Sequence, residues 1–162
     1  MGVLENKQLY IFDIDRTLIT SYNSSGELIW LKNMHPPFEK INDDTVKDVK
    51  GSISVLHQGA KEVLFHLFQQ NKDIGFLSAG SLLNTEYELQ PSVKIMKMFN
   101  IYLFFNSHKL LEYKNVKKEE HLKNFGECVF FDDDEKHIVP AYKLDNVTVV
   151  DRKSFTDWRQ LL

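Results

Sequence analysis

The sequence predicts an α/β protein with a three-layer, doubly wound, Rossmann-like parallel sheet of about five strands. Short apolar runs recur along the chain, and such runs are typical of parallel strands buried on both faces. Between them lie stretches whose apolar residues recur at helical spacing. This alternation of strand and helix favours a parallel sheet with right-handed crossovers.

Five apolar runs mark the expected strands. They are residues 9–12, 73–78, 101–106, 128–134 and 146–151. The first run, from Leu9 to Phe12, has no polar residue at all, which indicates a strand at the centre of the sheet.

The intervening segments predict five helices. They are residues 59–72, 92–100, 117–126, 135–145 and 154–162. Pro91 suits the first turn of the second helix, and Gly126 suits the end of the third. Ser154, with an acidic residue three positions later, indicates a capping-box start for the last helix.

Residues 18–57 interrupt the alternation soon after the first strand. The sequence ITSY-NSSG-ELIWLK predicts a short β-hairpin with its turn at Asn23 to Gly26, and HPPF (35–38) predicts an extended corner. The insertion is too short for a second domain, so we expect no large cap domain. We expect one domain over residues 1–162, with a flap at about 18–57 above the carboxyl edge of the sheet, where such folds bind ligands.

Bulk properties exclude several classes of protein. The net charge of −3 gives no electrostatic argument for nucleic-acid binding. No apolar run approaches the roughly 20 residues that a membrane span needs, and no signal peptide is evident at the N-terminus. The single cysteine, Cys128, excludes an internal disulfide and fits a reducing compartment, so we expect a cytoplasmic protein.

Two carboxylates, Asp13 and Asp15, follow the first strand. Residues two apart on a strand start out on the same face, and two crowded carboxylates either share a proton or share a cation. Three more acids, Asp132 to Asp134, end the fourth run. Carboxylates at two strand ends predict an all-oxygen site of the kind that Mg²⁺ prefers.

Other polar residues at strand ends complete the set needed to hold a phosphoryl group. Ser78 ends the second run, and a lysine-rich segment, EYKNVKKEEH, lies between the second run and the fourth. A hydroxyl and an ammonium near a metal ion can hold and neutralise phosphoryl oxygens.

In order along the chain, DIDRT, SAGS, a lysine near 114–118 and FFDDDE resemble the four motifs of the haloacid dehalogenase superfamily of phosphotransferases. FDIDRTL, HPPF and FFDDDEKHIV together resemble the small magnesium-dependent phosphatases of that superfamily, which lack a large cap. The resemblance covers nearly the whole chain. It implies a Mg²⁺-dependent phosphoric monoester hydrolase that works through an aspartyl-phosphate.

The resemblance also implies roles for the acidic residues. Asp13 is the expected nucleophile, and Asp15 is the expected general acid and base. The expected metal ligands are Asp13, Asp15 through its backbone carbonyl, Asp133, and Asp132 as a ligand or a neighbour of one.

The remaining expected site residues hold the substrate. Ser78 and a lysine bind the phosphoryl group. We choose Lys117, because the spacing Y-x-x-x-K from Tyr113 matches the subfamily, with Lys118 and Lys114 as alternatives. The residues expected around the substrate are Arg16, Thr17, Ala79 and Gly80.

The substrate is a phosphorylated small molecule or a phosphoprotein, and the resemblance suggests a phosphotyrosine-like or phosphosugar group. Arg16 stands where the superfamily commonly has Gly and the subfamily often an aromatic residue, and Ala79 stands where the subfamily tends to have Arg. Both differences lie at the mouth of the expected site and bear on substrate choice.

Two other functions compete with a phosphatase. A phospho-receiver domain also combines paired acids with a lysine, but it has no need of an acid two residues beyond its acceptor, as Asp15 is beyond Asp13. An inactive binding or regulatory protein with this fold is the other alternative. The histidines show no spacing typical of a zinc site.

Overall fold

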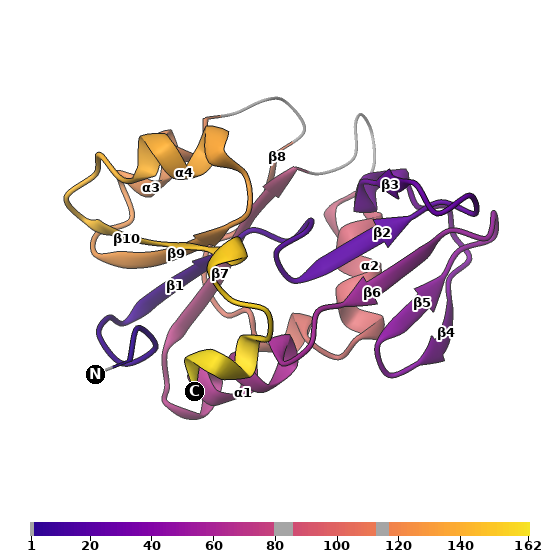
Figure 1. Cartoon of the computed structure of the whole chain (residues 1–162), viewed down its shortest axis with the longest axis horizontal. Coiled ribbons are helices and arrows are strands. Elements are labelled where there is room, and N and C mark those ends of the chain that lie inside the picture. The colour runs from indigo at the N-terminus through magenta and orange to yellow at the C-terminus, as the bar shows by residue number, and fades with distance from the viewer. Residues whose placement is uncertain (1, 80–85, 113–116) are drawn as a thin grey trace.

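The structure is a computed structural model of the chain and describes residues 2–79, 86–112 and 117–162. Two sheets lie side by side, with helices packed around the larger one (Figure 1). None of the helices in these three ranges has the length and apolar character that a membrane crossing requires.

The larger sheet is parallel and confirms the predicted fold class. Its strands run in the order β10-β9-β1-β7-β8. Their bounds are β1 Leu9–Phe12, β7 Asp73–Ala79, β8 Lys109–Glu112, β9 Cys128–Asp132 and β10 Val147–Asp151. In chain order this is 3-2-1-4-5, so the direction of winding reverses between β1 and β9. Doubly wound folds bind ligands at such a switch point.

Helices cover both faces of this sheet. The helices are α1 Ala60–Gln69, α2 Pro91–Met98, α3 Lys118–Leu122 and α4 Glu135–Ala141. Alternate residues of β1 point to opposite faces: Tyr10 and Phe12 join the core under α1 and α2, while Leu9 and Ile11 join the core under α3 and α4. These are the three predicted layers.

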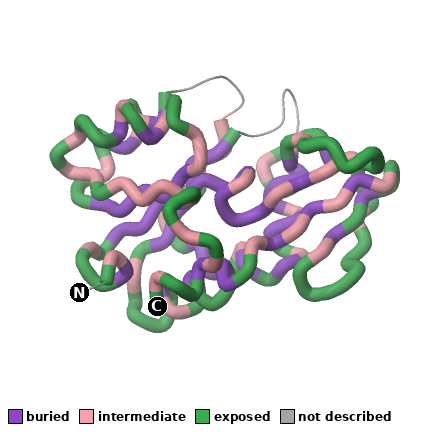
Figure 2. Tube along the Cα trace, viewed as in Figure 1, coloured by how far each residue is buried: buried purple, intermediate pink, exposed green. Residues whose placement is uncertain are grey.

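The central strands are buried along their whole length (Figure 2). Every residue of β1 and β9 is buried, which is the reason their sequences lack an alternating polar pattern. Phe12 of β1 stacks on Phe131 of β9 with ring centroids 4.5 Å apart, and Trp158 packs against both rings. This aromatic cluster fixes the two strand ends that carry the acidic residues.

The second sheet is antiparallel, in the order β3-β2-β6-β5-β4. Its strands are β2 Ile19–Tyr22, β3 Leu28–Ile29, β4 Glu39–Asn42, β5 Thr45–Lys47 and β6 Ile53–Leu56. The predicted hairpin is present as β2 and β3. However, the flap is a sheet of five strands rather than a short hairpin. The additional strands, β4 to β6, were missed because they are only three or four residues long and contain exposed residues, as in the EKIN sequence of β4, which is exposed throughout.

The predicted strand at 101–106 is wrong. Residues Tyr102–Phe104 form a 3₁₀ helix, and the third strand is β8, several residues later. Phe104 and Phe105 are apolar because they pack in the core, Phe104 against Phe65 and Phe68 of α1 and Phe105 against the sheet residues Phe12 and Phe76, although neither belongs to a strand. A short apolar run alone cannot separate these two cases.

The last predicted helix, at 154–162, is also shorter than expected. It is a 3₁₀ helix, Trp158–Leu161, and its capping box joins Asp157 to Gln160 instead of starting at Ser154. Before it, Arg152–Ser154 forms a separate 3₁₀ turn. The C-terminal segment therefore consists of two short turns, and the second of them packs against α1.

Candidate functional site

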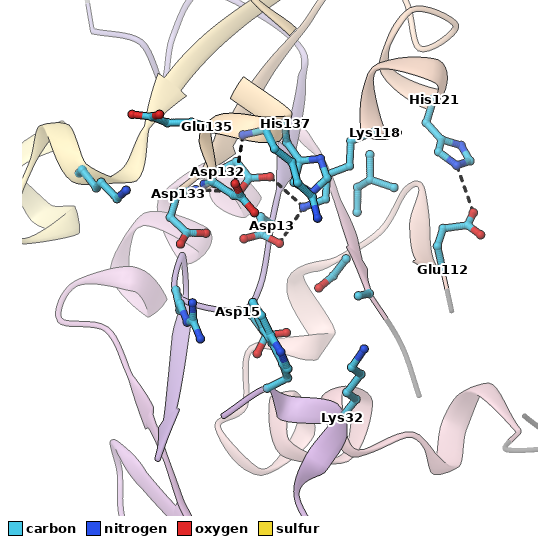
Figure 3. Close-up of a pocket in the computed structure, with 18 residues that line it drawn as sticks. Asp13, Asp15, Lys32, Glu112, Lys118, His121, Asp132, Asp133, Glu135 and His137 are labelled. Carbon is cyan, nitrogen blue, oxygen red and sulfur yellow. Dashed lines mark hydrogen bonds and ion pairs between the residues drawn. The ribbon is translucent and has the colours of Figure 1, made fainter. Parts of the chain in front are cut away.

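Asp13 and Asp132 meet because their strands are neighbours in register. Phe12 pairs with Phe131, so the residues that follow, Asp13 and Asp132, lie side by side at the carboxyl edge. The backbone N–H of Asp13 continues the ladder by donating to the Phe131 carbonyl at 2.8 Å. Their side chains line a pocket of about 620 Å³ at the switch point of the sheet (Figure 3).

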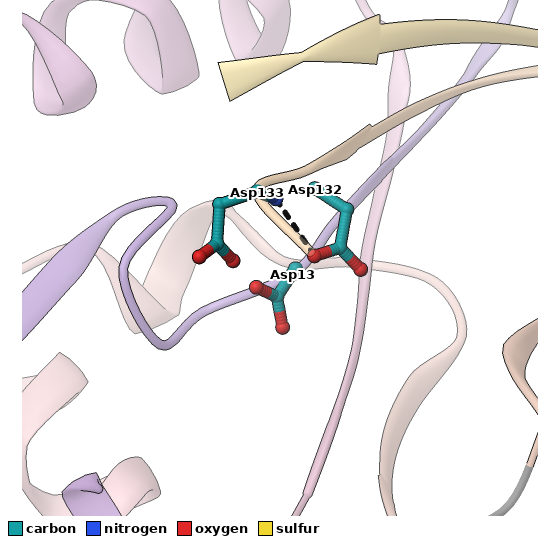
Figure 4. A group of neighbouring side chains, drawn as sticks. All are labelled: Asp13, Asp132 and Asp133. Atoms are coloured by element: carbon teal, nitrogen blue, oxygen red, sulfur yellow. Dashed lines mark hydrogen bonds between the residues drawn. The ribbon is translucent and has the colours of Figure 1, made fainter. Parts of the chain in front are cut away.

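Three carboxylates gather at the floor of this pocket. Asp13, Asp132 and Asp133 each offer an oxygen, and these atoms all lie within 4.8 Å of one another (Figure 4). Asp13 and Asp132 are buried, and Asp133 is partly buried. Buried carboxylates at this distance need a cation or shared protons, and an all-carboxylate oxygen set suits a hard divalent cation.

Asp13 has different partners on its two oxygens. Lys118 Nζ donates to Oδ1 at 2.8 Å, and Thr17 Oγ1 donates to Oδ2 at 2.8 Å. Burial alone would raise the pKa of Asp13, but the Lys118 charge and these hydrogen bonds hold that pKa below its ordinary value. Asp13 is therefore held as a carboxylate.

Lys118, rather than Lys117, is the lysine that reaches the acidic cluster. Its Nζ also donates to Asp132 Oδ2 at 2.8 Å, and its side chain is buried, while Lys117 is exposed at the N-cap of α3. Helix geometry explains the difference. Lys118 lies four residues before the buried Leu122 and shares its face, which is directed at the sheet. This placement replaces Lys117 in the candidate site.

Asp132 is fully engaged by the protein. Its Oδ1 accepts the backbone N–H groups of Asp133 at 2.7 Å and Asp134 at 3.0 Å, and its Oδ2 accepts Lys118. Burial, followed by the Asp13 charge, raises the pKa of Asp132 to about 8 and that of Asp133 to about 6. The crowding of these carboxylates therefore opposes their full ionisation, a cost that a bound cation would relieve.

Asp15 is buried beside the cluster but does not join it. Its Oδ1 accepts the backbone N–H of Leu31, the first residue of a 3₁₀ turn in the flap region, at 2.8 Å. Burial is the main cause that raises the pKa of Asp15 to about 7, and the nearby Asp13 charge adds to it. The pKa values of the two acids of DID are therefore shifted in opposite directions, down at Asp13 and up at Asp15.

Ser78 lies at the end of β7, next to β1, and lines the pocket. Its Oγ is buried and has no hydrogen-bond partner within the described residues. A buried hydroxyl without a partner carries a desolvation cost unless a ligand supplies the partner. Ala79 follows at the pocket wall, and Gly80 lies outside the residues that the structure describes.

The loop after Asp13 is tight. Ile14 O accepts the backbone N–H groups of Thr17, Leu18 and Ile19, and Arg16 adopts a left-handed conformation with φ 64°. Thr17 is fully buried, which allows its hydroxyl to reach Asp13, and Arg16 lines the pocket. The side chains of both expected residues thus border the site.

The C-terminal segment supports this loop, which the sequence did not reveal. Trp158 Nε1 donates to the Thr17 carbonyl at 3.1 Å, and Arg152 Nε approaches the same carbonyl at 3.2 Å. Arg152 Nε also donates to His57 Nδ1, so His57 carries its proton on Nε2, facing Thr20 Oγ1 at 2.6 Å. Residues about 140 positions from Thr17 in the chain could not be assigned to it from spacing.

The comparison with known proteins agrees with this geometry. No protein-family model matches the chain. A search of curated proteins finds human magnesium-dependent phosphatase 1, which is 25% identical over 142 residues, covering 85% of this chain and 73% of the human protein. The chain is similar to that protein over most of its length.

Proposed function

We propose that this protein is a magnesium-dependent phosphatase that hydrolyses a phosphomonoester through an aspartyl-phosphate on Asp13. The observation that carries the proposal is the setting of Asp13: a buried carboxylate, ionised by Lys118, among two further carboxylates and an unpartnered serine hydroxyl. The similarity to human magnesium-dependent phosphatase 1 supports the same activity. We also propose that residues 1–162 form a single haloacid dehalogenase-like domain.

The donor set fits Mg²⁺. The three clustered carboxylates supply only oxygen, and Asp133 has the fewest protein contacts of the three, so Asp13 and Asp133 are the proposed direct ligands. Asp132, with both oxygens engaged, orients Lys118 and the backbone at Asp133. We propose the Asp15 backbone carbonyl as a further ligand. When bound, Mg²⁺ would neutralise phosphoryl charge and hold the phosphoryl group in place.

The proposed chemistry has two steps. In the first, an Asp13 carboxylate oxygen attacks phosphorus, the bond from phosphorus to the leaving oxygen breaks, and Asp15 donates a proton to that oxygen. In the second, water attacks the phosphorus of the aspartyl-phosphate, Asp15 accepts a proton from the water, and inorganic phosphate leaves Asp13. Lys118 and the Ser78 hydroxyl would hold the phosphoryl oxygens in both steps.

The position of Asp15 supports its role as acid and base. Oδ1 is fixed by the Leu31 backbone N–H, which leaves Oδ2 for proton transfer. Because the Leu31 turn belongs to the flap region, the flap sets the orientation of the proposed acid. Burial favours the protonated acid needed for the first step.

Strand order bears on the phospho-receiver alternative. Receivers of the flavodoxin-like type have the order 2-1-3-4-5, whereas the order here is 3-2-1-4-5. The topology therefore argues against a receiver. An inactive binding or regulatory protein remains the alternative to an enzyme.

Phosphatase activity is tested directly with purified protein. We expect hydrolysis of an aryl phosphate in Mg²⁺, loss of activity in excess EDTA, and recovery when Mg²⁺ is restored. Ca²⁺ should inhibit, because its larger and looser coordination disturbs in-line geometry. A panel of phosphosugars and phosphotyrosine peptides would rank the substrates. Full activity after exhaustive EDTA treatment would contradict the proposal.

A further inference from the structure

The flap side of the pocket carries two cations, Arg16 and Lys32, together with the indole of Trp30. Lys32 lies in the Leu31–Asn33 turn, whose first N–H holds Asp15, and its side chain extends from the flap toward the pocket (Figure 3). Lys118, by contrast, rises from α3 on the opposite side of the carboxylates. The pocket therefore has Lys118 beside its carboxylates and two half-buried cations, Arg16 and Lys32, on its flap side, while Lys136 and Lys153, which also line it, are exposed.

The Arg16 side chain is held in a defined place. Its backbone is turned into the left-handed region with φ 64°, and its N–H donates to the Ile19 carbonyl at 2.6 Å. The guanidinium carbon lies 4.2 Å from the centre of the Trp30 ring, which is itself 43% exposed. Stacking on an aromatic face fixes the guanidinium while leaving its N–H groups available.

Within the described residues, neither cation forms an ion pair with an acidic side chain. Over residues 2–79, 86–112 and 117–162, the ion pairs involve other groups, and Arg16 Nε is buried without a hydrogen-bond acceptor. Of the other charges that line the pocket, His121 pairs with Glu112 at 3.1 Å, whereas Lys136 and Lys153 form no ion pair within the described residues but are exposed to solvent. A buried guanidinium N–H without an acceptor indicates that a ligand supplies one.

Arg16 lies on the side of Asp15 rather than that of Asp13. Arg16 follows Asp15 directly in the chain and its charge acts on Asp15, whereas Lys118 acts on both acids but donates its hydrogen bond to Asp13. In the proposed reaction Asp15 protonates the leaving oxygen, so the flap wall faces the leaving group. The phosphoryl group itself is served by Lys118, Ser78 and the carboxylate cluster.

We propose that Arg16 and Lys32 bind a second anionic group on the leaving group, so that the preferred substrates are phosphomonoesters with another negative charge. The second group is a carboxylate or another phosphate, which share the oxygen acceptors that a guanidinium and an ammonium recognise. This inference rests on the proposed phosphatase function and narrows its substrate class.

The test uses matched substrates that differ by one charge. Carboxyalkyl phosphates of increasing chain length are compared with their carboxamides in Mg²⁺, and propanediol bisphosphate is compared with propyl phosphate for the second source of charge. We expect kcat/KM for the acid to exceed that for the amide by about tenfold or more at one chain length, the effect of a hydrogen bond to a charged group. Equal rates at every length, together with equal rates for the phosphate pair, would overturn the inference.

Variants assign the effect to the two side chains. Arg16→Gln and Lys32→Met should reduce the acid-to-amide ratio toward one, and Arg16→Lys should restore part of it because it keeps the charge. Lys47→Met, an exposed position on β5 outside the pocket, is the matched control and should keep the wild-type ratio. A ratio that is unchanged in both flap variants would overturn the assignment.

The inference and the proposed function can fail separately. Hydrolysis of the carboxamides tests the phosphatase function, whatever the ratio. If no phosphate is hydrolysed, the corresponding phosphonate acid and amide are compared by calorimetry. Tighter binding of the acid, lost in Arg16→Gln, would still support the anionic anchor, and equal affinities would refute it.

Discussion

Lys118 Nζ lies 2.8 Å from Asp13 Oδ1, although the two residues are 105 positions apart in the chain. The same ammonium reaches Asp132 Oδ2 at 2.8 Å, so it joins the ends of the two strands that meet at the switch point. It is the one protein cation that the described part of the chain places in contact with the acidic cluster.

Lys118→Met should reduce kcat by about 10²-fold or more, a typical loss for one contact to a transition-state charge. Lys117→Met, an adjacent and exposed position, should remain close to wild type in the same assay. Circular dichroism of both variants checks that the fold is kept. Similar modest losses in the two variants would mean that the lysines act only as a diffuse basic surface.

Asp133→Asn should raise the Mg²⁺ concentration needed for half-maximal activity by at least about tenfold, because it removes a charged oxygen ligand. Asp134→Asn is the control: Asp134 caps α4 through the Lys136 N–H, and Asn caps a helix equally well. The thermal shift produced by Mg²⁺ gives a second measurement that does not depend on turnover. An unchanged Mg²⁺ response in Asp133→Asn would show that this carboxylate does not bind the metal.

His57 should make stability depend on pH. Burial, and then the Arg152 charge, lowers the pKa of His57 to about 4, below its ordinary value of 6.5. Between these values the unfolded chain binds more protons than the folded one, so the contribution of His57 is complete above pH 6.5 and is lost as the pH falls toward 4. The free energies of unfolding of wild type and His57→Gln, measured in urea, should differ most above pH 6.5 and approach each other as the pH falls to 4. A difference that stays constant over this range would contradict the assignment.

Trp158→Phe tests the support of the Thr17 loop from the C-terminal segment. The smaller phenyl ring keeps part of the packing with Phe12 and Phe131, but the N–H to the Thr17 carbonyl is lost, and any space left at this buried position adds to the cost. We expect a loss of about 1 kcal/mol in the free energy of unfolding, the usual net value of one hydrogen bond. The rate should fall as well, because Thr17 orients Asp13. The expected decrease in the free energy of unfolding together with an unchanged kcat would show that Trp158 acts on the fold alone.

The parts of the fold that the sequence predicted correctly are those in which local pattern and burial agree. The β1 and β9 runs are buried on both faces, so composition alone identifies them. The prediction of a strand at 101–106 was wrong because Phe104 and Phe105 are apolar for packing in the core outside any strand. The additional flap strands were not predicted because short, partly exposed strands depend on pairing with other segments, which a local sequence pattern does not show.

The acidic and hydroxyl residues of the site were predictable because each ends a strand and the parallel sheet brings those ends together. The structure places Lys118, one position after the chosen Lys117, at the acidic cluster. The four-residue spacing of Lys118 and the apolar Leu122 already indicated that Lys118 shares the buried face of this helix. Arg152, Trp158 and Lys32 reach the site by tertiary packing, which leaves no local pattern to read.

The roles proposed for Asp13 and Asp15 are tested most directly by treating the Asp15→Asn variant with an aryl phosphate. The leaving group of such a substrate needs little protonation, so attack by Asp13 should still occur slowly. The second step should stall without the base that activates water, since general acid–base catalysis contributes roughly 10²–10⁴-fold. Asp13→Asn/Asp15→Asn is the matched control and should take up no phosphoryl group.

Intact mass spectrometry of Asp15→Asn, followed by peptide mapping, is therefore the decisive measurement. We expect a phosphorylated protein in which the phosphoryl group lies on Asp13 and is removed by hydroxylamine. Slow multiple turnover without any phosphorylated species, or a phosphoryl group on another residue, would contradict the roles assigned to Asp13 and Asp15.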